Sequence, residues 1–151
     1  DYLLAEDRFE GYREALLDAN LKYNEQYLHI GNYRKESGYE AMARFCSLKE
    51  RPTAIVAGRD AQAAGIIEYA QAHSLRIPDD IALVSFENSE LAKSLHISSI
   101  DTDVYRISKE AAKQLIHIIN RKKERQPQNI VIPSELYIRS TCGASKPSSN
   151  A

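Results

Sequence analysis

The sequence predicts an α/β fold in which helices flank a mainly parallel sheet. Stretches with apolar residues at three- and four-residue spacing alternate along the chain with short apolar runs, which is the pattern of helices alternating with buried strands. The 151 residues suit one domain. A hydrophobic content of 43% and a charged content of 27% are those of an ordinary soluble domain and exclude a coiled coil or a collagen-like repeat.

The first part of the chain alternates between predicted helices and predicted strands. A helix is predicted over residues 6–19, where charges separate the apolar positions, with Asn20 as its stop. The β-prone run at 26–30 is predicted to be a strand, and a second helix to follow over 35–48. Residues 53–57 are short and apolar enough for a strand that is buried on both faces.

The same alternation continues to the end of the chain. Asp60 is a plausible cap for a helix that ends near His73, and strands are predicted over 81–86 and 97–100. Asp103 is a plausible cap for the long helix that follows. The remaining predicted elements are the helix 104–120, strand-like runs at 129–132 and 135–138, and a disordered tail over 144–151.

Charge and composition narrow the class of function. The formal net charge is −1, so these residues lack the basic footprint of a nucleic-acid-binding surface. No window approaches the roughly 20 apolar residues of a membrane helix. The first residues are too acidic for a signal peptide, and the missing initiator Met suggests a piece of a longer chain. Cys46 and Cys142 are better explained as small apolar fillers than as a disulfide, which fits a reducing cytoplasm.

The sequence offers no pattern that is typical of catalysis, of a metal centre or of a bound cofactor. It contains no nucleophile elbow, no Walker-type loop and no glycine-rich dinucleotide turn. The four histidines are scattered without metal-ligand spacing. We therefore expect neither an enzyme nor a metalloprotein.

A ligand site is predicted where the strands end. In an open parallel sheet, ligands bind beyond the carboxyl ends of the strands. Polar and aromatic residues follow three predicted strands there, namely Asn32 with Tyr33, Arg59 with Asp60, and Glu87 with Asn88. An aromatic ring, a guanidinium, carboxylates and amides suit a polyhydroxylated or charged small molecule.

Each of these residues also has a purely structural interpretation. Asp60 is explained better by a helix cap alone, and Tyr33 is as readily explained by packing against the next helix. Arg59 and Glu87 suit a structural ion pair about as well as ligand contacts. Asn32 fits a loop without any function, because Asn tolerates turn conformations.

Five segments resemble motifs of the LacI/GalR family of bacterial transcriptional regulators, in order and in register from about residue 6 to 141. The first has the pattern R-x-x-G-Y-x-x-A-L, and the strongest single match is IPDDIALVSFEN. The five segments are residues 8–16, 52–65, 77–88, 97–100 and 132–140.

The resemblance implies an effector-binding domain shaped like a type I periplasmic binding protein, in which two lobes clamp a small molecule. Residues 1–143 would be mostly the second lobe, and the helix-turn-helix that binds operator DNA would lie in a domain outside this chain. The helix 104–120 would belong to the missing first lobe. We therefore expect its apolar face to lack a partner here, and either to dock opportunistically or to pair with another chain.

The resemblance also assigns roles to individual residues. Arg8 matches an arginine that reaches effector hydroxyls, and Tyr33, beside Asn32, matches the stacking aromatic. Thr102 lies at the crossover between lobes, where further contacts often come. Arg59 and Glu87 stand where the family usually has Asn and Asp. Two arginines, Arg8 and Arg59, would favour an anionic effector such as a phosphorylated sugar, unless Arg59 pairs with Glu87 and fills the pocket.

Family members pair through their second lobes, which implies a homodimer. The candidate contacts here are Ala64, Ile67 and Leu91, although ordinary helix-to-sheet packing is the better explanation of the first two. The expected function is therefore sensing of a small-molecule effector by a cytoplasmic regulator of transcription. The alternative is a sugar-binding protein of a transport system with the same architecture.

Overall fold

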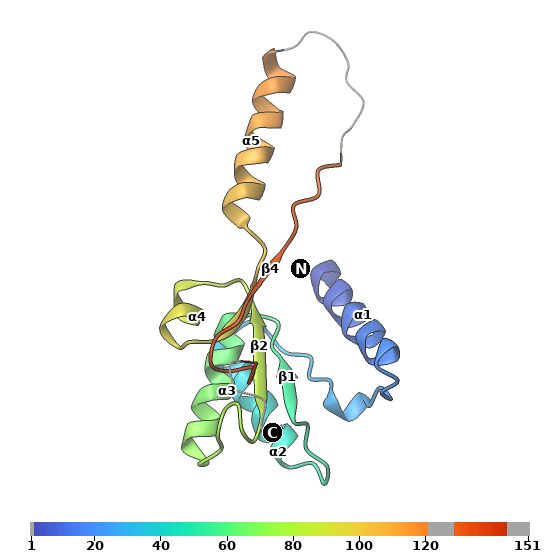
Figure 1. Ribbon diagram of the computed structural model, residues 1–151, viewed down its shortest axis with the longest axis vertical. Coiled ribbons are helices and arrows are strands. Elements are labelled where there is room, and N and C mark those ends of the chain that lie inside the picture. The colour runs from blue at the N-terminus through green and yellow to red at the C-terminus, as the bar shows by residue number, and fades with distance from the viewer. Residues whose placement is uncertain (1, 121–128, 145–151) are drawn as a thin grey trace, which may run out of the picture.

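The computed structural model describes residues 2–120 and 129–144, and Figure 1 shows their arrangement. Within these two ranges, five α-helices, a short 3-10 helix and four strands follow one another. In order they are α1 (Tyr2–Asp18), η1 (Glu25–Tyr27), α2 (Lys35–Cys46), β1 (Ala54–Val56), α3 (Asp60–Ala72), β2 (Ala82–Phe86), α4 (Glu90–Ser94), β3 (Ser98–Asp101), α5 (Val104–Asn120) and β4 (Glu135–Tyr137).

The strands form one sheet with the order β1-β2-β3-β4. β1, β2 and β3 are parallel, whereas β4 runs antiparallel to β3. The α/β fold with a mainly parallel sheet, predicted from the alternation of patterns, is therefore confirmed. The carboxyl ends of the three parallel strands lie at one edge of the sheet, which is the place that the sequence analysis nominated for a ligand.

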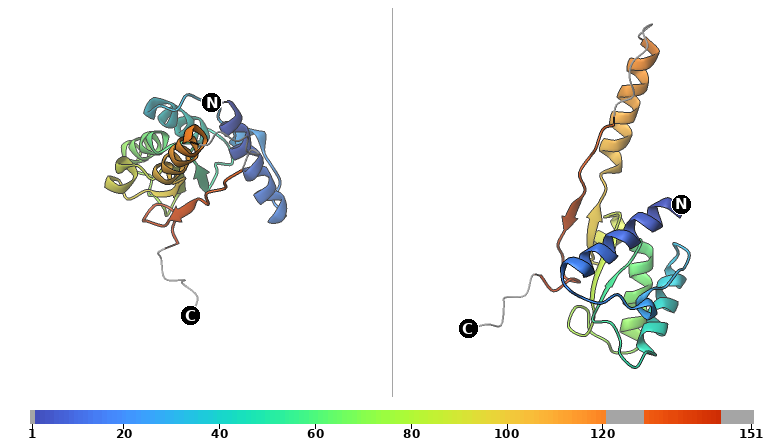
Figure 2. Two further views of the ribbon diagram at one scale, coloured as in Figure 1. Left: turned by 90° about the horizontal axis from the view of Figure 1, so that it is seen from above. Right: turned by 90° about the vertical axis from the view of Figure 1, so that its right-hand side faces the viewer.

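Helices α2 and α3 pack side by side over one face of the sheet (Figure 2), and the core lies beneath them. The fully buried side chains include Met42, Ile66, Ile81, Leu83 and Ile97. The two helices approach closely because each contributes a glycine at their crossing. A Cβ atom on Gly38 would overlap the backbone of Gln62, and one on Gly65 would overlap the backbone of Lys35.

The opposite face of the sheet is largely open. The side chain of Val56 in β1 is 58% exposed, so the prediction that this strand is buried on both faces is wrong. Helix α1 lies beside β1 in Figures 1 and 2. Its apolar residues pack locally, because Phe9 and Tyr12 both meet the ring of Tyr23 edge to face.

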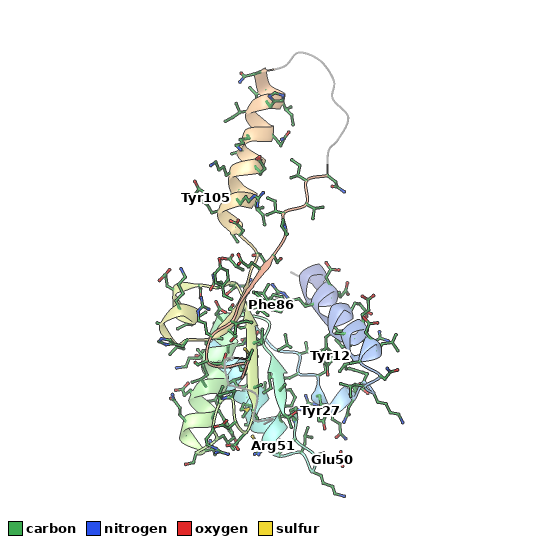
Figure 3. The ribbon with its side chains drawn as sticks, in the orientation of Figure 1. Tyr12, Tyr27, Glu50, Arg51, Phe86 and Tyr105 are labelled. Atoms are coloured by element: carbon green, nitrogen blue, oxygen red, sulfur yellow. The ribbon has the colours of Figure 1, made fainter. Side chains whose placement is uncertain are left out.

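Two predicted strands do not form. Residues 26–30 instead complete η1 and then continue extended from Leu28, and the Tyr27 hydroxyl donates to the carbonyl of Glu50 (3.1 Å; both residues are labelled in Figure 3). Within the described residues, no strand lies along the outer edge of β1 to pair with them. Residues 129–132 also lack a strand partner, because β3 pairs with β4 only as far as Asp101, after which the chain turns into α5.

Helix α5 begins where Asp103 was expected to cap it, since the backbone N–H of Arg106 donates to the Asp103 carboxylate (3.0 Å). The helix extends away from the rest of the chain (Figure 1), and none of its residues is buried. Leu115, Ile118 and Ile119 are all exposed, so the expected apolar face without a partner is present. No helix among the described residues is long and apolar enough to cross a membrane. Most of the predicted tail lies outside the described residues.

Candidate functional site

Arg8 connects α1 to the carboxyl ends of β1 and β2. Its Nη1 donates to the carbonyl of Gly58, which follows β1, at 3.0 Å. Its guanidinium carbon lies 4.5 Å from the ring centroid of Phe86, the last residue of β2, which is labelled in Figure 3. A cation over the face of an aromatic ring is attracted by the ring quadrupole. The arginine from the first helix is thus held at the edge where the parallel strands end.

Arg59 makes two contacts at the same edge. Its guanidinium carbon lies 4.3 Å from the ring centroid of Tyr33, and its Nε lies 3.2 Å from a carboxylate oxygen of Glu87. Both charged side chains are more than a third exposed, at 38% and 39%. The ion-pair interpretation of Arg59 and Glu87 is therefore confirmed. Tyr33, Arg59 and Glu87 meet as the sequence analysis predicted from their positions at the ends of successive elements.

The backbone at Glu87 is unusual. Its φ is 110° and that of the next residue, Asn88, is 50°. Residues other than glycine seldom adopt such positive values. Such conformations persist only where surrounding contacts enforce them. The Glu87 N–H donates to the carbonyl of Ile100 on the neighbouring strand (2.8 Å), and the Asn88 N–H donates to the hydroxyl of Ser99 (2.9 Å). These two bonds fix the turn that presents Glu87.

Asp60 lies beneath this turn rather than on its surface. Its side chain is only 1% exposed. One carboxylate oxygen accepts from the hydroxyls of Ser85 and Ser99, and the other accepts from the N–H and the hydroxyl of Ser89. Asp60 is also the first residue of α3, whose cap position is Arg59, so the helix-cap interpretation is wrong. Both oxygens of the Asp60 carboxylate already accept hydrogen bonds. Asp60 therefore positions the neighbouring turn and is not exposed to a ligand.

A second network lies under the end of β3. Sequence reasoning nominated Asn88 at this place but missed its partners Arg139 and Asp101. Arg139 donates to the Asn88 side-chain oxygen (2.5 Å), and the Asn88 amide donates to the Asp101 carboxylate (3.0 Å). The bond from Asn88, with a second from the N–H of Asp103, lowers the pKa of Asp101 below its ordinary value of 3.8. Phe86 was missed too, because a strand aromatic is usually a core residue. The signal for Phe86 was its position immediately before Glu87.

The two other predicted contacts lie at the margin of this group. Asn32 is exposed, and its side chain accepts from the N–H of Arg34 (3.1 Å), as in a local turn. Thr102 is half-buried in the short connection between β3 and α5. The structure therefore brings Arg8, Tyr33, Arg59 and Glu87 to one edge.

The arrangement is chemically suited to binding and offers nothing typical of catalysis. The half-buried guanidiniums of Arg8 and Arg59, each over an aromatic ring, and the exposed carboxylate of Glu87 can hold hydroxyl or oxyanion groups in pairs. The described part of the chain contains no group of three or more metal-ligating side chains.

The three residues considered for a dimer contact differ in exposure. Ala64 is 7% exposed, and Ile67 packs against the core. Leu91, in α4, is 40% exposed. Of the three, Leu91 offers the most surface.

Comparison with known proteins gives one family match and several relatives that are regulators by name. The family described as periplasmic binding protein-like domain matches residues 2–142. The NTD biosynthesis operon regulator NtdR of Bacillus subtilis (strain 168) is 31% identical over 134 residues, which are 87% of this chain and 41% of that relative. The HTH-type transcriptional repressor PurR of Yersinia pestis (strain Pestoides F) is 34% identical over 134 residues, 87% of this chain and 39% of the repressor.

Solved structures agree in fold and in extent. The putative transcriptional regulator LacI from Bacillus cereus subsp. cytotoxis superposes with a TM-score of 0.85 at 31% identity, and the match covers 91% of this chain and 49% of that one. The chain thus spans less than half the length of these relatives. It belongs to the periplasmic binding protein-like domain family, and its relatives within that family are LacI-family transcriptional regulators.

Proposed function

We propose that this chain is the effector-binding and dimerisation part of a bacterial transcriptional regulator of the LacI/GalR type. A small molecule, a sugar or a phosphorylated sugar, modulates operator binding by a helix-turn-helix that lies elsewhere in the complete protein. One observation carries this proposal. Arg8, Tyr33, Arg59 and Glu87, which come from four separate parts of the chain, meet at the carboxyl ends of β1 and β2.

The roles of the side chains follow from their chemistry. The planar guanidiniums of Arg8 and Arg59 hydrogen-bond two neighbouring oxygens of the effector at once. Tyr33 and Phe86 each hold one of these guanidiniums over a ring face and add apolar surface beside it. Asn32 and Thr102 supply further polar contacts at the margin. Asp60 acts through the turn that presents Glu87 rather than by contact with the effector.

Two relatives support a regulator over a transport protein. NtdR and PurR are named as a regulator and a repressor, and both match nearly the whole of this chain. A third, the transcriptional regulator CelR, was solved as a complex with cellobiose and superposes with a TM-score of 0.77 at 26% identity. This likeness supports a carbohydrate as the class of effector.

The proposal includes the assembly of the complete protein. Helix α5 packs into a first lobe that lies outside this chain, which explains why its apolar face has no cover here. Two copies pair through their second lobes, with Leu91 at the contact and with Ala64 and Ile67 supporting it from α3. Effector binding then changes the angle between lobes and the spacing of the two DNA-binding heads.

The test uses the complete protein. DNA that it binds is selected from a random pool, and a panel of neutral sugars and sugar phosphates is screened by thermal shift. Each stabilising compound is then added to the protein–DNA complex, and the affinity is followed by fluorescence anisotropy. We expect a compound that raises the melting temperature to change DNA affinity. A bound compound that leaves DNA affinity unchanged would contradict the regulatory role.

A further inference from the structure

In the candidate site, the anionic partner of Arg59 is a side chain of the protein itself, the carboxylate of Glu87. The Glu87 carboxylate lies 3.2 Å from Arg59 Nε, and the guanidinium carbon of Arg59 lies 4.3 Å from the ring centroid of Tyr33. The ring orients the guanidinium, and Glu87 occupies part of its hydrogen-bonding edge. Tyr33 is therefore covered on this face by a cation, not presented bare to a ligand ring.

The second guanidinium of the site, that of Arg8, makes contacts of a different kind. Arg8 donates to the carbonyl of Gly58 and lies over Phe86, and no carboxylate pairs with it among the residues that the structure describes. The other acidic groups nearby are engaged. Asp60 is buried among serine hydroxyls, and Asp101 is bound by Asn88, which also accepts from Arg139. Of the two guanidiniums at this edge, only that of Arg59 is thus paired with a carboxylate among the described residues.

We propose that the effector is an anion and that it binds by exchange, its oxyanion group taking the place of the Glu87 carboxylate on Arg59 while Arg8 supplies a second guanidinium. This inference rests on the proposed function and specifies the chemistry of the effector as a small molecule that carries an oxyanion group. Exchange favours such an anion over a neutral sugar. A hydroxyl that displaced Glu87 would replace a charge-assisted hydrogen bond with one about half as strong.

The turn at Glu87 is held by backbone bonds that do not involve the Glu87 carboxylate. The N–H of Glu87 donates to the Ile100 carbonyl and the N–H of Asn88 donates to the Ser99 hydroxyl. The side chain can therefore leave the guanidinium while the backbone stays in place. Because the pair is more than a third exposed, it is weak enough to be opened by a ligand.

The experiment uses inorganic phosphate as the probe and the complete protein at constant ionic strength, with binding measured by calorimetry. Glu87→Gln removes the internal competitor, and Arg59→Gln removes the anion's partner. The ion pair between Arg76 and Asp80, at 2.7 Å and outside the candidate site, supplies controls in Arg76→Gln and Asp80→Asn. Phosphate that binds elsewhere in the complete protein is the same in all five proteins, so the differences between them report on this site.

We expect Glu87→Gln to bind phosphate about two- to fivefold more tightly than wild type, the value of a partly exposed ion pair. Arg59→Gln should bind it about tenfold or more weakly, because charge-assisted hydrogen bonds are lost. The controls should match wild type. Weaker or unchanged binding in Glu87→Gln would overturn the exchange. A neutral sugar that binds wild type and shifts DNA affinity, while its phosphate does neither, would overturn the anionic effector yet leave the proposed function standing.

Discussion

Asp60 accepts two hydrogen bonds from Ser89, one from the backbone N–H and one from the hydroxyl, each at 2.7 Å. The two residues are 29 positions apart in sequence, and their contact joins the start of α3 to the start of α4. Between β2 and Ser89 lies the turn that presents Glu87. The buried Asp60 thus holds Ser89, at the far end of the turn that presents the exposed Glu87.

The first prediction concerns this buried carboxylate. Asp60→Ala leaves the hydroxyls of Ser85 and Ser99 and the N–H of Ser89 without their acceptor, so we expect a loss of about 2–4 kcal/mol in the free energy of unfolding. Urea denaturation measures it, with the exposed Asp18→Ala as control. Equal losses for the two variants would show that the buried contacts contribute nothing.

The second prediction concerns the crossing of α2 and α3. A methyl group on Gly65 would overlap the backbone of Lys35, so Gly65→Ala should lower the free energy of unfolding by about 1–3 kcal/mol. Gly11 in α1 is the matched control, because nothing lies within 4 Å of an added Cβ there. Gly11→Ala should be neutral or stabilising, since alanine favours a helix. Two variants of equal stability would contradict the close approach.

The third prediction concerns the exposed face of α5. Leu115 and Ile118 are exposed, so we expect this chain to self-associate as its concentration rises, which sedimentation velocity measures. The double variant Leu115→Gln with Ile118→Gln should stay monomeric, whereas the control Ser108→Gln on the same helix should associate like wild type. A monomeric wild type whose α5 amides are strongly protected from hydrogen exchange would contradict the prediction.

The fourth prediction concerns acid stability. The hydrogen bonds from Asn88 and from the Asp103 N–H lower the pKa of Asp101, so the folded state favours its charged form. That stabilisation is present above the ordinary pKa of 3.8 and is lost as the pH falls through the lower folded value. Urea denaturation at pH values on either side of this range gives the free energy of unfolding. As the pH falls, it should decrease less steeply for Asp101→Asn than for wild type. Identical decreases would rule out the contribution.

Much of the fold was predictable because its signals are local. Helices α2, α3 and α5 each carry an apolar stripe, and the predicted bounds of α5 agree with the structure. β2 and β3 were predicted because short apolar runs between helices are typical of a parallel sheet. The run at 26–30 is also β-prone, but the described residues provide no neighbouring strand with which it could pair, and no local pattern specifies such a partner.

The site was predictable in position but not in detail. The rule that strand ends converge placed Arg59 and Glu87 together, as the structure does, whereas Tyr33 reaches Arg59 from the loop before α2 and not from a strand end. The burial of Asp60 depends on three serines that lie 25 to 39 residues away, and only the folded chain brings them within reach. The same holds for Arg139, whose partner Asn88 is 51 residues distant. Long-range polar contacts of this kind leave no periodic signal in the sequence.

The central claim is that a small-molecule effector binds where Arg8 meets the ends of β1 and β2. The most direct test is calorimetry of that effector, identified by the thermal-shift panel, with the complete protein and two variants. Arg8→Ala removes the guanidinium that lies over Phe86, and Arg13→Ala removes one on the same helix that pairs only locally with Glu10. We predict that Arg8→Ala weakens binding by about tenfold or more while Arg13→Ala binds like wild type. Equal affinities in all three proteins would contradict the claim.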